Sequence, residues 1–389
     1  MIRRFSKTWW LIIILCLMSV TSCSSDIGEI ENQNYATAIG VDFVDDEYVI
    51  YIQMIGLGSI AKSENGEKSP PKVYVSKTKG KTFIDGFFKA YHTAQERILW
   101  AHVTAIVLSQ SALEQGLGNI FDGLTRYYEF RPTPWMFATK DSIEDILTAS
   151  GFFQQSSLNT ILHSPESSYE QSSTIKPVKL NRMAREVTEP GRTTYLPSLS
   201  VNKKQWAINS KKEPKLEING AFYLKGQDFQ GFFSWEQLKG MRWITSETQR
   251  ASLLVPEGNN PEFVAVLKNQ AFDIQPIKSN DNFEFKLTYL ATGLISNRMK
   301  NNVINIEAME DFTQETIIAE IRDLYQLGLK HNVDFLNLEH QLYRKHHSDW
   351  KRLKEQETLL REDSIKGIHA AITLEHSGSF KNRKIRIGE

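Results

Sequence analysis

The amino terminus constrains this chain more than any other part of its sequence. Residues 1–10 carry Arg3, Arg4 and Lys7 without an acid, and the 12-residue run Trp9–Val20 that follows is almost wholly apolar. A charged start and a short apolar run are typical of an export signal, whereas a membrane-spanning helix would need roughly 20 apolar residues. We therefore expect residues 1–22 to be a removable signal peptide, so that the rest of the chain folds outside the cytoplasm.

The end of this segment predicts a lipid anchor. Val20-Thr21-Ser22-Cys23 resembles the bacterial lipobox, in which an aliphatic residue and two small residues precede a cysteine. The Cys23 thiol would take a diacylglycerol, and two acyl chains hold a protein on a bilayer because each buried CH₂ contributes about 0.8 kcal/mol. We therefore expect lipidation at Cys23 and a membrane location on the extracytoplasmic face. The alternative is a short uncleaved anchor with an ordinary cysteine.

Cysteine usage limits how the mature chain can be stabilised. Cys16 would leave with the signal peptide, Cys23 would be consumed by lipid, and the sequence holds no third cysteine. Intrachain disulfides, cysteine metal ligands and a cysteine nucleophile are thereby excluded. The 389 residues less the first 22 leave 367, a length that suggests two or three domains, which must be stabilised by packing.

The charge balance argues against a nucleic-acid partner. The chain has 46 basic and 46 acidic residues, and loss of Arg3, Arg4 and Lys7 leaves 43 basic residues, for a net charge near −3. Such a chain presents no basic face for the phosphates of a nucleic acid. The basic tail at 381–386 is interpreted as a solvated end.

Residues 23–150 are predicted to form an N-terminal α+β domain. Two apolar runs flank the acidic turn Asp45-Asp46-Glu47 and predict a β-hairpin, and Thr82 is placed to cap the helix that follows it. The expected elements are the hairpin of 36–43 and 48–55, strands at 72–75, 103–108 and 135–139, and helices at 82–95, 111–126 and 141–147.

The composition changes after residue 150. Ser, Gln, Asn and Glu dominate residues 150–182, and a stretch with several prolines follows. We expect residues 151–210 to be a linking region or a small second subdomain, with Thr193–Ile208 as its ordered part.

The main domain boundary is placed near Lys211, and residues 211–389 are predicted to form a C-terminal α+β domain. Alternation of apolar and polar residues indicates antiparallel strands that are covered on one face. The expected elements are a hairpin of 221–224 and 229–233, strands around 263–267 and 283–289, helices at 313–330 and 334–343, and a closing strand at 368–374.

Nothing in the sequence predicts a catalytic or cofactor site. Gly80-Lys81-Thr82 lies between a strand and a helix, but the glycine that a phosphate loop needs five positions before Gly80 is Val75, so a plain helix entrance is favoured. No nucleophile elbow or dinucleotide-binding turn occurs. Acidic pairs such as Glu144/Asp145 are ordinarily solvated, although spacing alone does not exclude acid–base chemistry. An enzyme is therefore unsupported, and no cofactor is expected.

The histidines do not predict a metal site. His340, His346 and His347 lie near Glu339, but His340 and His346 are six residues apart and do not share a helical face. We interpret the three as a solvated helix end, and His102 as a hydrogen-bonded structural histidine.

Several short stretches, taken in chain order, resemble one known family. The first is Glu29-Ile30 followed by Tyr35-Ala36-Thr37-Ala38-Ile39-Gly40-Val41-Asp42, and the densest lie within 97–146: Leu99-Trp100-Ala101-His102, Gln115-Gly116-Leu117 and Leu124-Thr125-Arg126-Tyr127-Tyr128-Glu129. Further matches are Ala221-Phe222 with Gly231-Phe232-Phe233-Ser234, and Asp334-Phe335 with Leu342-Tyr343-Arg344 and Trp350. Together they resemble the C subunit of bacterial spore germinant receptors, the GerC-type lipoproteins.

The chain departs from the family pattern in two places. Ser24-Ser25-Asp26 follows the cysteine where the family usually has Trp-Asp, and the glycine-containing turn after Asp334 is here Leu336-Asn337-Leu338. Both departures bear on local contacts, near the tether and between the two late helices.

The resemblance implies a non-catalytic subunit of three mixed α/β modules, with mixed or antiparallel sheets and packed helices. It implies attachment by lipid to the outer surface of the spore inner membrane, and two integral membrane partners, an A-type subunit and a B-type, transporter-like subunit. That assembly would respond to small nutrient molecules in spore germination. The expected role is that of a scaffold or coupling subunit acting through a surface on the N-terminal domain, and direct binding of a small molecule is left open.

Two readings from other classes stay open at this point. A solute-binding lipoprotein of an ABC importer would share the export signal and the size, but it would alternate strands and helices in two similar lobes around a cleft. A lipid-anchored enzyme would need a deep pocket with convergent ionisable groups.

The lipid anchor makes the first testable prediction. Cys23→Ala removes the only thiol that could carry the acyl chains, so the protein should pass from the membrane pellet to the soluble fraction of exported protein. Fractionation in high salt measures this, with Cys16→Ala as the control that should stay in the pellet. A Cys23→Ala variant that still pelleted would contradict the anchor.

Overall fold

The computed structural model describes residues 33–56, 72–127, 129–153, 155–258, 260–279, 282–299, 305–355 and 360–375. The signal peptide predicted at 1–22, the lipidation site Cys23 and the basic tail at 381–386 all lie outside the described residues.

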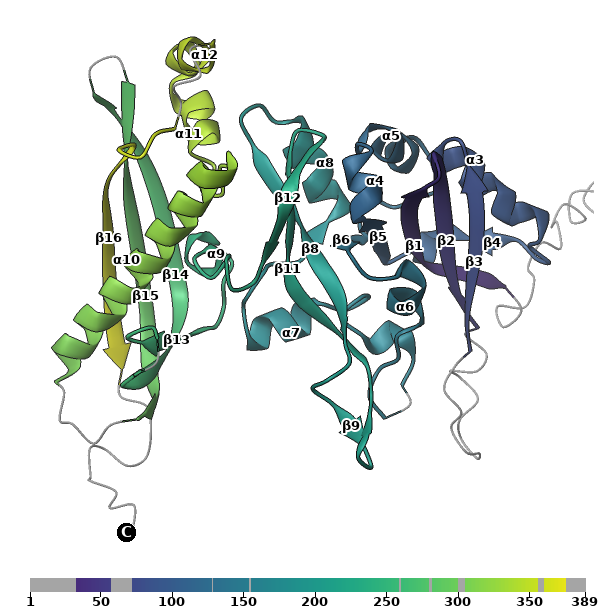
Figure 1. The fold of residues 1–389 in the computed structure, drawn as a ribbon, viewed down its shortest axis with the longest axis horizontal. Coiled ribbons are helices and arrows are strands. Elements are labelled where there is room, and N and C mark those ends of the chain that lie inside the picture. Colours follow the sequence, from purple (N-terminus) through teal and green to yellow (C-terminus); the bar gives the residue numbers. More distant parts are fainter. Residues whose placement is uncertain are drawn as a thin grey trace, which may run out of the picture.

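A large mixed sheet runs through the part of the chain between residues 34 and 234 (Figure 1). Its strands are β1 (Asn34–Val44), β2 (Glu47–Ile55), β3 (Val73–Gly80), β4 (Ile98–Leu99), β5 (Ala105–Ser109), β6 (Trp135–Thr139), β7 (Val178–Lys179), β8 (Thr193–Asn202), β11 (Lys215–Lys225) and β12 (Asp228–Ser234). The order across the sheet is β12-β11-β8-β6-β5-β1-β2-β3, with β4 beside β1 and β7 beside β6. The central strands β8, β6, β5 and β1 are parallel, and antiparallel hairpins extend both edges.

Helices cover both faces of this sheet, so its central strands are apolar on both sides. Ile39 and Ile106 face one core, whereas their neighbours Ala38 and Ala105 face the other. The first core also takes residues of α3 (Phe83–Lys89), α4 (Gln110–Glu114), α5 (Gly118–Arg126) and α8 (Leu180–Thr188), and the second takes those of α6 (Ile143–Thr148). Helix α7 (Glu166–Gln171) and three single turns, η2 (Ala90–His92), η3 (Trp100–His102) and η4 (Ser157–Asn159), lie in the connections.

A second, four-stranded sheet forms the other end of the molecule (Figure 1). Its order is β13 (Ala251–Val255), β14 (Phe263–Ser279), β15 (Asn282–Arg298) and β16 (Ile365–Glu375), of which β15 and β16 are parallel. The long helix α10 (Ile306–His331) lies across one face of this sheet, and every second residue along β15 is buried beneath it. Shorter helices flank it: α9 (Met241–Ile244), α11 (Leu338–Lys345) and α12 (His347–Glu355). The sequence-predicted α+β class, with mixed and antiparallel sheets and packed helices, is confirmed.

Several local predictions are confirmed because local residues determine them. Asp45 and Asp46 form the turn between β1 and β2 with φ of 55° and 59°, a conformation that Asp tolerates better than most residues. The Thr82 side chain accepts a hydrogen bond from the Asp85 N–H at 3.1 Å and caps α3, so Gly80-Lys81-Thr82 is a plain helix entrance.

Two helix predictions differ from the structure. The helix expected at 111–126 is split into α4 and α5 at Gly116, whose φ of 106° cannot continue a helix. The helix expected at 334–343 begins only at Leu338, because Asp334 accepts the Glu339 N–H at 2.8 Å and Asn337 adopts φ of 58°. The apolar spacing continues through both interruptions, so periodicity alone could not find them.

The chain around Lys211 does not separate two sheets. β8 and β11, one on each side of that position, pair antiparallel from Thr193↔Lys225 to Asn202↔Lys215. Between them, β9 (Ala207–Ile208) and β10 (Lys211–Lys212) form a small two-stranded hairpin. The compositional change that placed the boundary near Lys211 marks this hairpin, and the start of 211–389 belongs to the same sheet as the end of 151–210.

Gly80 is required by close packing. A Cβ added at Gly80 would lie 2.1 Å from the backbone nitrogen of Gly86, so β3 and α3 can touch only because both positions lack a side chain. This contact fixes the helix on the sheet edge and explains the glycine of the Gly-Lys-Thr stretch without a phosphate.

We therefore predict that Gly80→Ala destabilises the protein by about 2 kcal/mol, because the added methyl group must push backbone apart. Gly367→Ala is the matched control, since a Cβ there meets nothing within 4 Å, and it should be neutral. Urea unfolding of both variants measures the difference. Equal stability of the two would contradict the close approach of β3 and α3.

Candidate functional site

Two parts of the structure concentrate interactions beyond an ordinary core: the junction between the two sheets and an aromatic face on the N-terminal half. Neither contains the site residue predicted from the sequence, because Cys23 lies outside the described residues. Within the described ranges no three His, Cys, Asp or Glu side chains gather as metal ligands, and no helix is long and apolar enough to cross a membrane.

The first feature of the junction is an aromatic contact. Phe335, in the loop after α10, stands edge-on to Tyr223 of β11 and Phe233 of β12, with ring centroids 4.7 and 4.9 Å apart. All three rings are buried. Edge-to-face pairs of this kind add about 0.5–1.5 kcal/mol of stabilisation beyond the burial of apolar area. They therefore hold the part of the chain that contains the four-stranded sheet, called the second unit below, against the edge of the large sheet.

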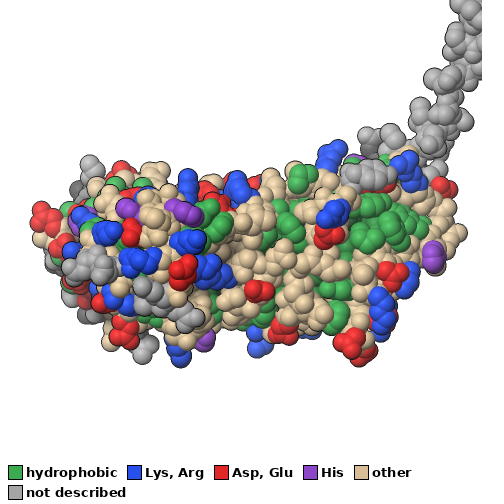
Figure 2. Space-filling view, turned by 90° about the horizontal axis from the view of Figure 1, so that it is seen from above, with side chains coloured by type: hydrophobic (Ala, Val, Ile, Leu, Met, Phe, Trp, Pro, Cys, Tyr) green, Lys and Arg blue, Asp and Glu red, His purple; other side chains and the backbone are tan. Residues whose placement is uncertain are grey.

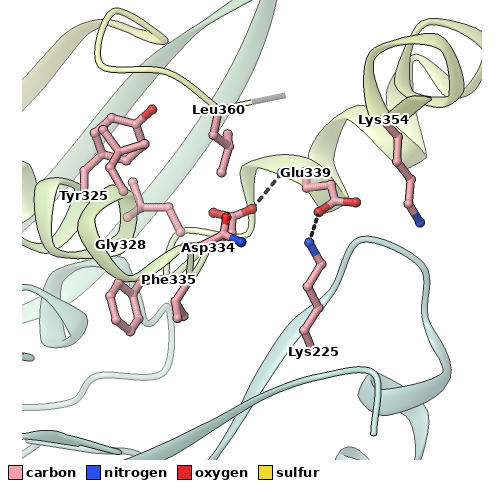
Figure 3. Close-up of a pocket in the computed structure, with 12 residues that line it drawn as sticks. Lys225, Tyr325, Gly328, Asp334, Phe335, Glu339, Lys354 and Leu360 are labelled. Atoms are coloured by element: carbon pink, nitrogen blue, oxygen red, sulfur yellow. Dashed lines mark hydrogen bonds and ion pairs between the residues drawn. The ribbon is translucent and has the colours of Figure 1, made fainter. Parts of the chain in front are cut away.

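A buried carboxylate joins the same elements by charge (Figure 3). Glu339 of α11 is only 3% exposed; it accepts from Lys225 of β11 at 2.7 Å and from the Trp350 indole N–H at 3.2 Å. Beside it, the Asn337 side chain accepts the Thr193 N–H at 2.7 Å. A buried charge without partners is costly, so these bonds fix how α11 sits against β8 and β11.

Asn337 explains one departure from the family pattern. Its φ of 58° lies in the left-handed region, which Asn tolerates better than most residues. Asn therefore serves in a turn where the family usually has glycine, and its side chain adds the bond to Thr193 across the junction.

A second buried carboxylate holds α9 against α10. Glu320 accepts from the Arg242 guanidinium at 2.7 and 2.9 Å and from the Trp243 indole at 2.6 Å. The Arg242 guanidinium also lies over the Trp243 ring, 4.5 Å from its centroid. Both arginine bonds come from one guanidinium nitrogen, and this charge-assisted pair holds the segment that leaves β12 on the long helix of the second sheet.

A third buried carboxylate lies on the side of the large sheet that faces the junction. Glu186 of α8 bonds Arg182 at 3.0 Å, Arg192 at 2.9 Å and the Thr194 hydroxyl at 2.5 Å. Burial opposes its ionisation, but the positive charges of Arg182 and Arg192 outweigh burial and hold the pKa of Glu186 below its ordinary value.

Two cavities flank the junction. One, of about 420 Å³, is lined by Lys225, Tyr325, Asp334, Glu339 and Lys354 (Figure 3). The other, of about 570 Å³, lies between α8 and the second unit and is lined by Arg182, Glu186, Arg192, Glu247 and Gln341 among others. In the first cavity Lys225 is paired with Glu339, and in the second Glu186 is paired with Arg182 and Arg192, so these bonds favour a rigid connection.

The histidines are separated by the fold. His340 is buried and lies 3.3 Å from the Pro190 carbonyl oxygen and 3.6 Å from Glu189, so its interpretation as a solvated helix end was wrong. His347 is exposed, and His346 packs on Phe283. His102 is exposed and packs edge-on to Tyr35 at 4.9 Å.

The aromatic face lies on α3, η2 and the loop after α5, and is made of Phe88, Tyr91, Tyr127 and Phe130. Phe88 is 45% exposed and the other three are half-buried. The Tyr91 and Tyr127 hydroxyls lie 2.9 Å apart, and the Trp100 indole donates to Tyr91 at 2.8 Å. Figure 2 shows hydrophobic side chains gathered at this end of the molecule.

The aromatic face is rigid because buried rings support it. Phe87 stands 4.3 Å from Trp100, 5.2 Å from Tyr127 and 5.4 Å from Phe130, measured between ring centroids. Aromatic side chains held in one arrangement lose little entropy on binding and are enriched in the energetic centres of protein interfaces. This face can therefore take a protein partner.

Sequence reasoning found only part of these sites. Phe335, Trp100, Tyr127 and Trp350 stood in the stretches that carry the family resemblance. The buried pairs of Glu320 with Arg242 and Glu339 with Lys225 were missed, since their partners lie 78 and 114 residues apart. An acid on an otherwise apolar helical stripe, as Glu320 is between Ile317 and Leu324, was the one available signal.

Asp334 gives the junction a pH dependence. Burial raises the pKa of its carboxyl to about 6, although the backbone N–H groups of Glu339 and Leu338 oppose the rise. The unfolded chain titrates near 3.8, so the contribution of Asp334 to stability is greatest below that pH. It falls as the pH rises to about 6 and is constant above.

We predict that Asp334→Asn removes this dependence. The shift corresponds to about 3 kcal/mol, so the unfolding free energy of the variant relative to the natural protein should rise by up to that amount between about pH 4 and pH 7.5. Urea titrations across this range measure it, with the exposed Asp273→Asn as control. A difference that stayed flat with pH would contradict the raised pKa.

Comparison with known proteins agrees with this architecture. Residues 26–201 match the family described as "Spore germination protein N-terminal domain", and residues 219–378 match "Spore germination B3/ GerAC like, C-terminal". The two matches are in order along the chain, and the segment between them, residues 202–218, holds the β9–β10 hairpin.

Individual relatives give the same result. Spore germination protein KC of Bacillus subtilis (strain 168) is 23% identical over 372 residues, which cover 89% of this chain and 90% of the relative. The putative spore germination protein YfkR of the same organism is 24% identical over 276 residues, 70% of this chain and 67% of the relative.

A solved structure shares the fold. The crystal structure of the GerBC protein superposes with a TM-score of 0.52 over 90% of this chain and 99% of that chain, at 13% sequence identity. The family matches, the relatives and this fold together show that the chain belongs to the spore germination protein family of GerC-type germinant receptor subunits.

Proposed function

We propose that this chain is a non-catalytic, lipid-anchored subunit of a nutrient germinant receptor, needed for the response of bacterial spores to small-molecule germinants. The observation that carries the proposal is the pair of family matches, which together run from residue 26 to residue 378. Attachment through Cys23 would place the subunit on the extracytoplasmic face, at the outer surface of the spore inner membrane.

The subunit acts as a scaffold or coupling element with the integral membrane A-type and B-type subunits. A scaffold must hold its partners in a fixed arrangement. The junction supports this role because buried ion pairs and aromatic contacts hold the two sheets in one arrangement. The aromatic face supplies a rigid surface for a partner, and its place on the N-terminal half agrees with the surface expected there.

The ABC solute-binding alternative receives less support. Such a protein has two similar lobes around a ligand cleft, whereas the ten-stranded and four-stranded sheets of this chain differ in size and topology. Among the charged groups that line the junction cavities, Glu339 is paired with Lys225 and Glu186 with Arg192.

Two experiments test the proposal. Deletion of the gene in a strain that lacks related receptors should abolish nutrient-triggered germination, and unchanged germination would contradict the function. The full chain, tagged and extracted from membranes in mild detergent, should carry the A-type and B-type subunits with it. Recovery of an ABC permease instead would favour the importer.

The aromatic face makes a sharper prediction. Phe88→Ser removes a ring that is already 45% exposed, so folding should survive while recovery of the membrane partners falls at least about fivefold, as for a typical interface hot spot. Leu254→Ser, equally exposed at 45% on β13, is the matched control. Full recovery with Phe88→Ser would place the partner contact elsewhere.

A further inference from the structure

The β9–β10 hairpin projects beyond the ends of β8 and β11 as a convex tip (Figure 1). Ile208 pairs with Lys211 and Ala207 with Lys212, and Asn209 and Ser210 close the turn with φ of 47° and 69°. Two left-handed residues in succession make the tight turn that follows the twist of a hairpin. The Glu213 N–H also bonds the Trp206 carbonyl at 3.0 Å, so the hairpin is ordered as far as Trp206.

Large apolar side chains are exposed at this tip. Trp206, directly before β9, is 46% exposed, and Ile208, at the end of β9, is 55% exposed. Phe152 comes from a distant loop and stands edge-on to Trp206 at 4.8 Å, and its neighbour Phe153 is 92% exposed. A group of large, exposed apolar side chains in contact with one another is typical of an interaction site.

Lysines surround these side chains. Lys203, Lys204, Lys211 and Lys212 are all exposed, and Glu213 is the only acid between residues 203 and 214. Glu213 is itself paired with Lys215. The Lys212 ammonium bonds the Lys204 carbonyl oxygen at 2.7 Å, which gathers the positive charge behind the turn.

We propose that this aromatic–lysine tip, made of Phe152, Phe153, Trp206, Ile208 and the four lysines, inserts into the interface of an anionic phospholipid bilayer. Tryptophan and other amphipathic aromatic residues prefer the headgroup level of a membrane, and lysines beside them are attracted to anionic headgroups. Trp206 and Ile208 enter between headgroups while the lysine ammonium groups stay at the phosphates.

The shape of the tip favours a bilayer over a protein partner. A stable protein interface buries about 800 Å² on each side in a well-packed patch, whereas this tip is a narrow, convex end of a hairpin. A bilayer needs no complementary surface. In Figure 1 the tip points the same way as the end of the large sheet at which β1 begins and β2 ends.

The tip would be a second membrane contact, separate from any attachment of the amino terminus. One attachment point leaves a protein free to rotate above the surface, and a second fixes its orientation. The lipid-dependent contact therefore sets which face of the subunit meets its neighbours.

The test follows the tip itself on membranes. Ile208→Cys is introduced into the full chain, labelled with a polarity-sensitive dye, and reconstituted into vesicles of phosphatidylglycerol with phosphatidylcholine or of phosphatidylcholine alone. Quenching of the dye by aqueous iodide should be at least about threefold weaker in the anionic vesicles, because the tip enters the interface only there. Leu290→Cys, 47% exposed on β15, should show no difference.

Two further arms separate the explanations. Substitution of the four lysines by glutamine in the Ile208→Cys chain should remove the protection, and protection that persisted would overturn the role of charge. Protection of the dye from iodide in native membranes, but in neither kind of vesicle that lacks other proteins, would overturn the proposal in favour of a protein contact. Equal quenching in both vesicles at position 208 would also overturn it. The unsubstituted chain corrects for label at Cys16 or Cys23, and the readout does not depend on how the amino terminus is attached.

Discussion

The pairing of β11 with β8 is the constraint on which the architecture depends. These strands lie on opposite sides of the segment between the two family matches, and their hydrogen bonds run from Thr193↔Lys225 to Asn202↔Lys215. As a result, the first residues of the C-terminal region complete the sheet of the N-terminal region. The chain continues from β12 into the second sheet. The position of the second sheet is therefore determined by the contacts that α9, α10 and α11 make at that edge of the large sheet.

Buried carboxylates do this bonding. Glu320 and Glu339 are each almost fully buried, and each is satisfied by a cation and an indole N–H. An apolar contact would pack nearly as well in several rotations, but a buried carboxylate is stable only where its partners meet it, since removing one partner of such a pair costs about 3–5 kcal/mol. The polar groups therefore add orientation to an interface whose binding energy comes largely from Phe335 and its neighbours.

The sequence predicted the parts of this fold that local chemistry decides. The Asp45-Asp46 turn, the Thr82 cap and the alternation in β15 each depend on residues a few positions apart, and each was found. The β8–β11 pairing and the bonds of Glu320 and Glu339 depend on residues brought together by the whole fold, so no spacing pattern encodes them. Near Lys211 the composition led to the wrong conclusion. The polar hairpin there suggested a linker between two domains, whereas the strands on its two sides, β8 and β11, pair with each other. Cys23 is the reverse case: a local motif predicts it fully, and no tertiary contact is needed to do so.

Two buried groups, His163 in the N-terminal half and Asp334 at the junction, respond to pH with opposite sign. His163 in the N-terminal half is buried beside Thr104, and burial lowers its pKa to about 4. Its contribution to stability is present above about pH 6.5 and is lost as the pH falls through that value to about 4. Asp334 at the junction behaves conversely between about 3.8 and 6. Each shift is worth about 3 kcal/mol, so these two contributions nearly cancel each other between about pH 4 and 6. Mild acid therefore weakens the contribution of His163 in the N-terminal half and strengthens that of Asp334 at the junction.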